Sequence, residues 1–216
     1  GLVFPSMFMD VAEETGLIDA IGLWVLRTAC TQNKAWQDAG LPPLRMGVNI
    51  SARQFDQPRE FAKSVNRVLA STGLDPVWLE LEMTESVLWK TAEESIQVLR
   101  RLGKSGTRIA VDDFGTGYSS LSYLKQLPIH TLKIDRSFVR DVDTDKDSDV
   151  IVATIIGMAH SLNLRVAAEG VDNLAQLSVL KRLGCDEHQG YLFSKALPAD
   201  DIARRYLSIR QLEFGA

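Results

Sequence analysis

Apolar positions along the chain follow two spacings in turn, one typical of helices and one typical of strands. The longest helical pattern covers residues 19–39 and ends at Gly40. Glycine often follows the last residue of a helix because it tolerates a left-handed backbone. Short apolar segments predict strands at 44–50, 77–83, 108–111, 131–134, 164–168 and 187–190. Helical spacing predicts further helices at 61–73, 96–103, 119–126, 150–162, 174–183 and 199–206.

The regular alternation of strands and helices indicates the fold class. A strand, a helix and a second strand form a right-handed crossover with parallel strands, and many such units close most naturally into a TIM-like α/β barrel. Six strands are expected, with no linker between them, so residues 1–216 are predicted to form one domain. The leading helix has no strand before it. We therefore expect the first barrel strand to lie upstream of Gly1, so that the domain is partial at its N-terminus.

Composition narrows the function classes. Of the 216 residues, 45% are hydrophobic and 24% are charged, as in ordinary globular proteins. The formal net charge of -4 argues against binding of duplex nucleic acid, which requires a basic face. No apolar run approaches the roughly 20 residues of a membrane span, and no signal peptide pattern is present. Cys30 and Cys185 have no metal-binding spacing and are predicted to be reduced core residues of a cytoplasmic protein.

The most informative stretch follows the strand predicted at 108–111. Asp112 and Asp113 are adjacent carboxylates at the end of that strand, and a turn with Gly115 and Gly117 leads from them into the next helix. Acidic residues rarely stand side by side where a buried strand ends unless a positive group binds between them. The pattern indicates a divalent-cation site followed by a loop that can fold over a ligand.

Other predicted strands also end in polar residues. In a barrel of this type the carboxyl ends of the strands meet at one face, which carries the reactive groups. The residues expected there are Asn49, Glu82, Asp112, Asp113, Lys133, Asp135, Glu169 and Gln189. Carboxylate and amide oxygens suit Mg2+, Mn2+ or Ca2+. The three histidines lack the spacing of zinc ligands.

These residue types predict displacement at phosphorus. Two hard cations bridged by Asp112 are the usual arrangement for in-line attack on a phosphate ester. Lys133 and Glu169 are then expected to orient and deprotonate the attacking water. The prediction rests on the joint placement of these residues at strand ends, because a single such residue is often structural.

Structural roles are the alternative for several acidic residues. Glu80 and Glu85 are compatible with solvated positions, and Asp135 with the N-cap of a helix. The acidic run 141–149 resembles a calcium-binding loop, but a lysine replaces the turn glycine of such a loop and a valine replaces its bidentate glutamate. We expect that run to be a solvated loop whose last acids favour the start of the following helix.

Six motifs, in order along essentially the whole chain, resemble the EAL domain family. The longest is the ten-residue segment DDFGTGYSSL at 112–121. The other five are NISARQF at 49–55, EMTE at 82–85, LKID at 132–135, AEGV at 168–171 and QGYLF at 189–193. The resemblance implies a TIM-like barrel that hydrolyses cyclic di-GMP, a bacterial second messenger, to linear pGpG with Mg2+ or Mn2+.

The resemblance also implies a role for each site residue by its position. The metal ligands that it implies are Asn49, Glu82, Asp112 and Asp113, the last for a second metal. Lys133 and Glu169 would position and activate the water. The residues implied on the substrate and loop side are Glu85, Asp135 and Gln189. Of these, Glu85 would anchor the loop that begins at Asp113.

The sequence departs from the family pattern near its start. The Glu-Ala-Leu triplet, whose glutamate is a metal ligand in the family, is absent from these residues, as is a nearby arginine that holds substrate phosphate. The departure implies that the set of metal ligands in these residues is incomplete. One outcome is that the isolated fragment is inactive. A smaller departure is Ala196, where the family more often has proline.

Two other functions stay open at this point. The first is a receptor that binds cyclic di-GMP without cutting it, which the absent triplet favours. The second is an unrelated barrel enzyme that uses Mg2+ for enolisation, because lysine and carboxylates at strand ends also allow that reaction. The resemblance further implies that the chain is part of a larger multidomain signalling protein. This portion is expected in the cytoplasm, even where the whole protein is anchored in a membrane. The resemblance also implies a homodimer formed through the helices after Asp135.

Overall fold

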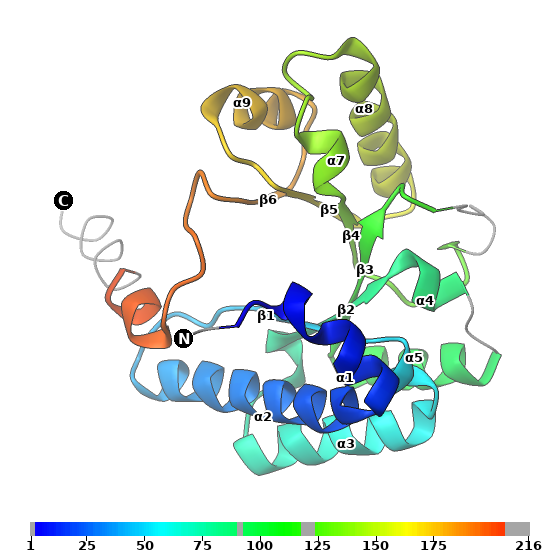
Figure 1. Cartoon of the computed structure of the whole chain (residues 1–216), viewed down its shortest axis with the longest axis vertical. Helices are drawn as coiled ribbons and strands as arrows, with labels where there is room; N and C mark the ends of the chain where they lie inside the picture. The colour runs from blue at the N-terminus through cyan, green and yellow to red at the C-terminus, as the bar shows by residue number, and fades with distance from the viewer. Residues whose placement is uncertain (1–2, 90–92, 118–123, 206–216) are drawn as a thin grey trace.

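Six strands form one parallel sheet in chain order, from β1 at one edge to β6 at the other. The structure is a computed structural model that describes residues 3–89, 93–117 and 124–205. The strands are β1 (Met46–Asn49), β2 (Leu79–Thr84), β3 (Arg108–Phe114), β4 (Thr131–Ile134), β5 (Arg165–Glu169) and β6 (Glu187–Gln189). In Figure 1 they form an arc with β1 and β6 at its two ends. The prediction of a TIM-like barrel with six parallel strands is confirmed.

Helices lie along the outer side of this arc (Figure 1). They are α1 (Met9–Thr15), α2 (Leu17–Asp38), α3 (Pro58–Thr72), α4 (Glu85–Trp89), α5 (Glu93–Lys104), α7 (Arg136–Val139), α8 (Lys146–Ser161) and α9 (Leu174–Arg182). Residues 199–205 are also helical. Most of the helix predicted at 119–126, and the end of the one predicted at 199–206, lie outside the described residues. In the part of the chain that the structure describes, no helix is both long and apolar enough to cross a membrane.

The two faces of the sheet differ in chemistry because successive side chains of a strand point to opposite faces. On β2, Leu79, Leu81 and Met83 are fully buried against the helices, in one core with helix residues such as Val65 and Leu99. The alternate residues of the strands form the inner face of the arc. That face carries Glu80, Glu82, Asp112, Thr131, Lys133 and Glu169.

An irregularity at the end of β3 places both predicted aspartates in the strand. Val111 is aligned with Leu132 of β4, and Phe114 is aligned with Ile134, so three steps on β3 correspond to two on β4. The extra residue makes a β-bulge, a feature that re-aims side chains at the end of a strand. The predicted end of this strand at residue 111 is therefore corrected to Phe114.

Other element boundaries also differ from the predictions. The strand expected at 77–83 begins at Leu79, after a 3-10 turn (Pro76–Trp78), and the helix expected at 150–162 begins at Lys146. Asp145 is the N-cap of that helix and accepts hydrogen bonds from the next turn through its carboxylate. The acidic run is thus divided between a loop and a helix start, and its last acids stabilise the helix as expected.

Both cysteines lie in the core, as predicted. Cys30 and Cys185 are buried and form no disulfide among the described residues. Burial raises the pKa of each thiol to about 11. The thiols are therefore protonated and unreactive near neutral pH.

Candidate active site

Lys133 is the centre of the polar cluster on the inner face of the arc. Its Nζ atom lies 2.6 Å from Glu82 Oε2 and 2.5 Å from Glu169 Oε1. Asp112 Oδ1 is 3.4 Å from the same nitrogen. These four residues come from β2, β3, β4 and β5, so the site depends on the register of four adjacent strands.

Charge balance in the cluster is uneven, with one ammonium among several carboxylates. Burial opposes the charge of Lys133, but the carboxylates around it outweigh burial and raise the pKa of Lys133 above its ordinary value. Burial also raises the pKa of Glu82 and Glu169, against the attraction of Lys133, and repulsion from Asp112 adds to this effect. The cluster therefore has more negative charge than one lysine compensates, which favours binding of a cation.

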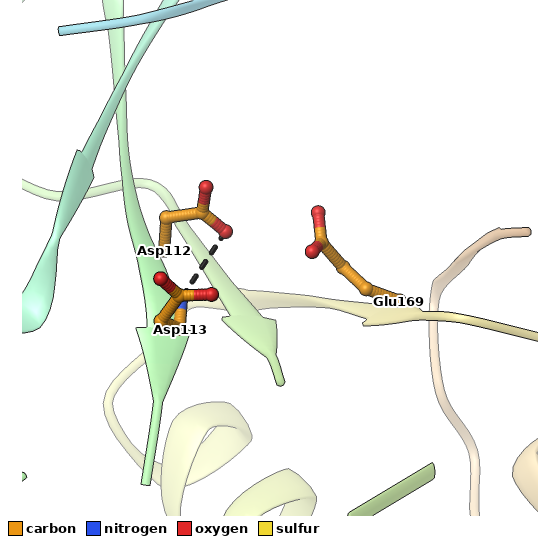
Figure 2. A group of neighbouring side chains, drawn as sticks. All are labelled: Asp112, Asp113 and Glu169. Carbon is orange, nitrogen blue, oxygen red and sulfur yellow. Dashed lines mark hydrogen bonds between the residues drawn. The ribbon is translucent and has the colours of Figure 1, made fainter. Parts of the chain in front are cut away.

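Asp112 and Asp113 both face the space in front of Lys133 because of the bulge in β3. Figure 2 shows their carboxylates on one side of this space and that of Glu169 on the other. Each of the three offers an oxygen within 4.8 Å of the other two. Asp112 Oδ1 also accepts a hydrogen bond from the Asp113 backbone N–H, at 3.1 Å, which fixes the pair locally. The three oxygens are close enough together to bind one divalent cation.

Asp113 has an unusual backbone conformation. Its φ angle is +53°, in the left-handed region that few residues other than glycine adopt. Burial raises the pKa of its carboxyl, and the neighbouring charges of Asp112 and Asp135 raise it further. An outlier of this kind at the centre of an acidic cluster is typical of functional sites, where surrounding contacts hold the strained conformation.

Asp135 has the structural role that was one alternative for it. It is the N-cap of α7, and its Oδ1 accepts a 2.9 Å hydrogen bond from the Ser137 backbone N–H. Its side chain also contacts that of Asp113. Asp135 thus joins the start of a helix to the edge of the acidic cluster.

Glu85 lies beneath the glycine turn and is buried, which excludes the alternative of a solvated position. Only 2% of it is exposed, and its Oε2 accepts a 3.1 Å hydrogen bond from the Gly115 backbone N–H. A Cβ atom at Gly117 would lie 3.1 Å from Glu85 Oε1, so this glycine allows close packing on the carboxylate. Glu85 therefore contacts the turn that follows Asp113, while the motif residues from 118 onward lie outside the described residues.

Asn49 and Gln189 flank the cluster on the two edge strands. Asn49 is aligned with Glu82, and Gln189 is aligned with Glu169, so each shares a face with its neighbour in the cluster. Both are exposed. Gly47, on the same strand as Asn49, leaves room for the Glu82 side chain, because a Cβ atom at Gly47 would lie 2.1 Å from Glu82 Oε1. The structure thus brings these two predicted residues to the rim of the cluster.

A solvated position was one alternative for Glu80, and the structure excludes it. It is 6% exposed on the inner face, where its Oε1 accepts a 2.5 Å hydrogen bond from Thr131 Oγ1. Neither residue was proposed as part of the site. The signal was the alternation Leu79-Glu80-Leu81-Glu82, which places both glutamates on the same face of one strand.

The histidines are not part of the cluster. The Ile109 backbone N–H donates to His130 Nδ1 at 3.2 Å, and His160 Nε2 lies 3.0 Å from Asp186 Oδ2. His188 Nε2 is buried and has no hydrogen-bond partner among the described residues. His188 is therefore not the satisfied core residue or surface residue that was expected, whereas the other two have ordinary structural partners.

A sequence model of the EAL domain matches residues 1–196. The chain belongs to the EAL domain family. It is 47% identical over 196 residues to the signaling protein YkoW of Bacillus subtilis, and the aligned region covers 91% of this chain and 24% of YkoW. It is 44% identical over 202 residues to the bifunctional diguanylate cyclase/cyclic di-GMP phosphodiesterase MucR of Pseudomonas aeruginosa, covering 94% of this chain and 29% of MucR.

Solved structures of EAL domains have the same fold. The MucR phosphodiesterase in its c-di-GMP complex superposes with a TM-score of 0.89 at 44% identity, over 94% of this chain and 81% of that one. The curated relatives are longer. This chain spans about a quarter of their length, 24% of YkoW and 29% of MucR.

Proposed function

We propose that this EAL domain binds cyclic di-GMP and hydrolyses it to linear pGpG. The observation that carries the proposal is the convergence of Asp112, Asp113 and Glu169 within 4.8 Å, beside the ammonium of Lys133. Family membership supports the choice of substrate, because MucR, a relative at 44% identity, is named a cyclic di-GMP phosphodiesterase. Its structure in complex with c-di-GMP has the same fold as this chain.

The residues present fit a divalent cation of the Mg2+ or Mn2+ type. The donor set is oxygen only, and burial together with mutual repulsion raises the pKa of Glu82, Asp113 and Glu169, so a cation would relieve an unfavourable concentration of negative charge. The residues that would hold two such cations are Asn49, Glu82, Asp112 and Asp113, with Glu169 beside them. When bound, the cations would supply positive charge where negative charge develops on the phosphoryl oxygens.

The chain's own residues have separate tasks in the proposed reaction. The water oxygen bonds to phosphorus while the bond from phosphorus to one ribose 3′ oxygen breaks, which leaves a 5′-phosphate and a 3′ hydroxyl. Glu169 accepts the proton of the water, because its carboxylate faces the space in which the phosphate and the water would lie (Figure 2). Lys133 orients Glu169 and the water through its ammonium, and the departing 3′ oxygen takes a proton from solvent.

The loop residues and rim residues would hold the substrate. Glu85 fixes the turn after Asp113 through the Gly115 N–H, so that the turn can close over the ligand. Asn49 and Gln189 are exposed at the rim, where their amides can donate to phosphate or to a guanine base. Asp135 supports this arrangement through its contact with Asp113.

The test is incubation of the chain, and of any longer natural protein that carries it, with cyclic di-GMP and Mg2+ or Mn2+. Chromatography is expected to detect pGpG. Glu169→Gln is expected to lower the rate by about a hundredfold or more, because a general base contributes about that much. Glu60→Gln, which changes an exposed carboxylate on α3, is the matched control and is expected to keep the rate.

The outcome separates the candidate functions. Turnover that Glu169→Gln abolishes supports the phosphodiesterase. Tight binding of cyclic di-GMP by calorimetry without turnover in the longer protein would instead identify a receptor. Absence of any binding would overturn both functions.

The expected assembly and location stay predictions. A homodimer, membership in a larger signalling protein and a cytoplasmic site of action would all suit a domain that acts on a diffusible nucleotide. Analytical ultracentrifugation across a range of concentrations tests the dimer, because a monomer at all concentrations would contradict it.

A further inference from the structure

A second hydrogen bond lies directly below the ion pair of the site and repeats its geometry. Glu82 on β2 bonds to Lys133 on β4, and the two residues are 51 positions apart. Glu80 on β2 bonds to Thr131 on β4, also 51 positions apart. Glu80 thus precedes Glu82 by two residues on β2, and Thr131 precedes Lys133 by two residues on β4. Residues two apart on a strand lie on the same face, about 7 Å from each other.

Both bonds connect strands that are not adjacent. β3 lies between β2 and β4, so the side chains must reach across it. On β3, Ala110 is aligned with both Glu82 and Thr131 and is fully buried, and Arg108 is aligned with Glu80. The small side chain of Ala110 leaves space on this face between β2 and β4. The lower bond therefore acts between β2 and β4 directly, beyond what the backbone hydrogen bonds of the sheet provide.

The lower bond is also better protected from water than most polar contacts on this surface. Glu80 is 6% exposed and Thr131 is 1% exposed, and the distance between Oε1 and Oγ1 is 2.5 Å. A hydrogen bond between buried groups is stronger than the same bond exposed to water. Loss of its donor would leave the buried Glu80 carboxylate without this partner, so the local structure would rearrange.

We propose that Glu80 and Thr131 are positioning residues, whose hydrogen bond holds β2 and β4 at the spacing that places the Glu82 carboxylate on the Lys133 ammonium. Neither residue touches the reacting atoms. Their effect on turnover passes through Glu82 and Lys133, and to that extent the proposal rests on the proposed function. The geometric part, the position of Lys133, does not depend on turnover.

Two substitutions at Thr131 separate the hydroxyl from the shape of the side chain. Thr131→Val keeps the shape and removes the hydroxyl, whereas Thr131→Ser keeps the hydroxyl. The matched control is Thr107→Val, because Thr107 is fully buried and its Oγ1 has no hydrogen-bond partner within the described residues. Each of the three variants thus changes a single buried threonine, but only Thr131→Val removes the hydroxyl that donates to Glu80.

The first measurement is the NMR signal of the Lys133 side chain, assigned by its loss in Lys133→Arg. Thr131→Val is expected to shift this signal, and Thr131→Ser and Thr107→Val are expected to leave it in place. The second measurement is turnover of cyclic di-GMP. Thr131→Val is expected to lower it about tenfold, because a displacement of catalytic groups by about 1 Å can cost about a hundredfold and a smaller one costs less. The two controls are expected to retain turnover.

An unchanged Lys133 signal in folded Thr131→Val would overturn the proposal, as would an equal shift in Thr107→Val. Should Thr131→Val fail to fold, Thr131→Ala is measured in the same way, because it also removes the hydroxyl that donates to Glu80. The same shift is then expected, and its absence has the same meaning. A shift of the Lys133 signal in a chain that turns over no cyclic di-GMP would support the positioning role while refuting the proposed function.

Discussion

The outer and inner faces of the sheet are buried by different physical means. Leu132 and Lys133 are neighbours on β4, 0% and 6% exposed, yet one packs in the apolar core and the other lies among carboxylates. Burial of an apolar side chain is favourable by itself. Burial of a charge is unfavourable unless partners compensate it. The comparison indicates that the outer face stabilises the fold, whereas the inner face is maintained for its chemistry.

The inner face also differs from the interior of a typical TIM barrel, which layers of branched apolar side chains fill. Here the positions that face inward include Glu80, Glu82 and Lys133. Burial raises the pKa of Glu82, so its ionised form is less favourable in the folded protein than in the unfolded chain, even beside Lys133. Local destabilisation of this kind is common at active sites, and binding of a ligand or cation then contributes stability.

The largest expected effect comes from substituting the two neighbours on β4. Leu132→Ala is expected to lower the free energy of unfolding by about 2–5 kcal/mol, because a cavity remains in the core. Lys133→Met is expected to lower it by about 3–5 kcal/mol, because Glu82 and Glu169 lose their cation. Urea denaturation without divalent cations measures both.

Addition of Mg2+ then distinguishes the two faces. Part of the loss in Lys133→Met is expected to be recovered, because a divalent cation can replace the ammonium among the carboxylates. The loss in Leu132→Ala is expected to stay the same relative to wild type. Equal recovery in both variants would contradict the division of the sheet into a structural face and a chemical face.

A smaller effect is expected from Asp113→Asn. The pKa of Asp113 is raised in the folded state, so the native protein holds this proton to a higher pH than the unfolded chain does. Stability of the metal-free protein therefore decreases as pH rises from the ordinary carboxyl range through the raised pKa. Asp113→Asn removes this contribution and suits the left-handed backbone. Above that range it is expected to stabilise the metal-free protein by up to about 1 kcal/mol, after allowance for solvent screening.

Thermal unfolding at pH 5 and pH 7.5 checks this expectation. The difference in stability between the two pH values should be smaller in Asp113→Asn than in wild type, and the increase in Tm caused by Mg2+ should also be smaller. An Asn variant that is less stable than wild type at pH 7.5 without metal would show that the Asp113 charge is not a source of repulsion.

The smallest effect is expected at Asp135, where the inner face meets a helix start. Asp135→Ala is expected to lower stability by about 1 kcal/mol, because the cap of α7 is lost. Asp135→Asn keeps a capping oxygen and is expected to stay within a few tenths of a kcal/mol of wild type. Chemical denaturation of both variants at neutral pH makes the comparison. An equal loss in both would mean that the charge of Asp135, rather than its cap, stabilises this edge.

Much of the site could be predicted because it depends on local pattern. Strands alternating with helices indicate a parallel sheet, and in such a sheet the carboxyl ends of the strands meet. This geometry places Glu82, Asp112, Lys133 and Glu169 together before any coordinates are known. Three of those carboxylates do contact the lysine. The family motifs add the choice of substrate, which pattern alone does not supply.

Tertiary structure decided what pattern could not. Whether Glu80 is solvated or buried depends on Thr131, 51 residues away and on a strand that is not its neighbour. The burial of Glu85 likewise depends on the backbone of Gly115. Contacts of this kind carry no local signal, because the partners meet only after the sheet has formed.

The sequence by itself determined the order of the elements, the parallel sheet and the residue types at the mouth of the barrel, because local periodicity governs them. Only the tertiary structure decided that a bulge directs both Asp112 and Asp113 toward Glu169, and that Lys133 contacts three carboxylates. These features follow from the alignment of four strands, which is set by packing over the whole domain rather than by any one segment.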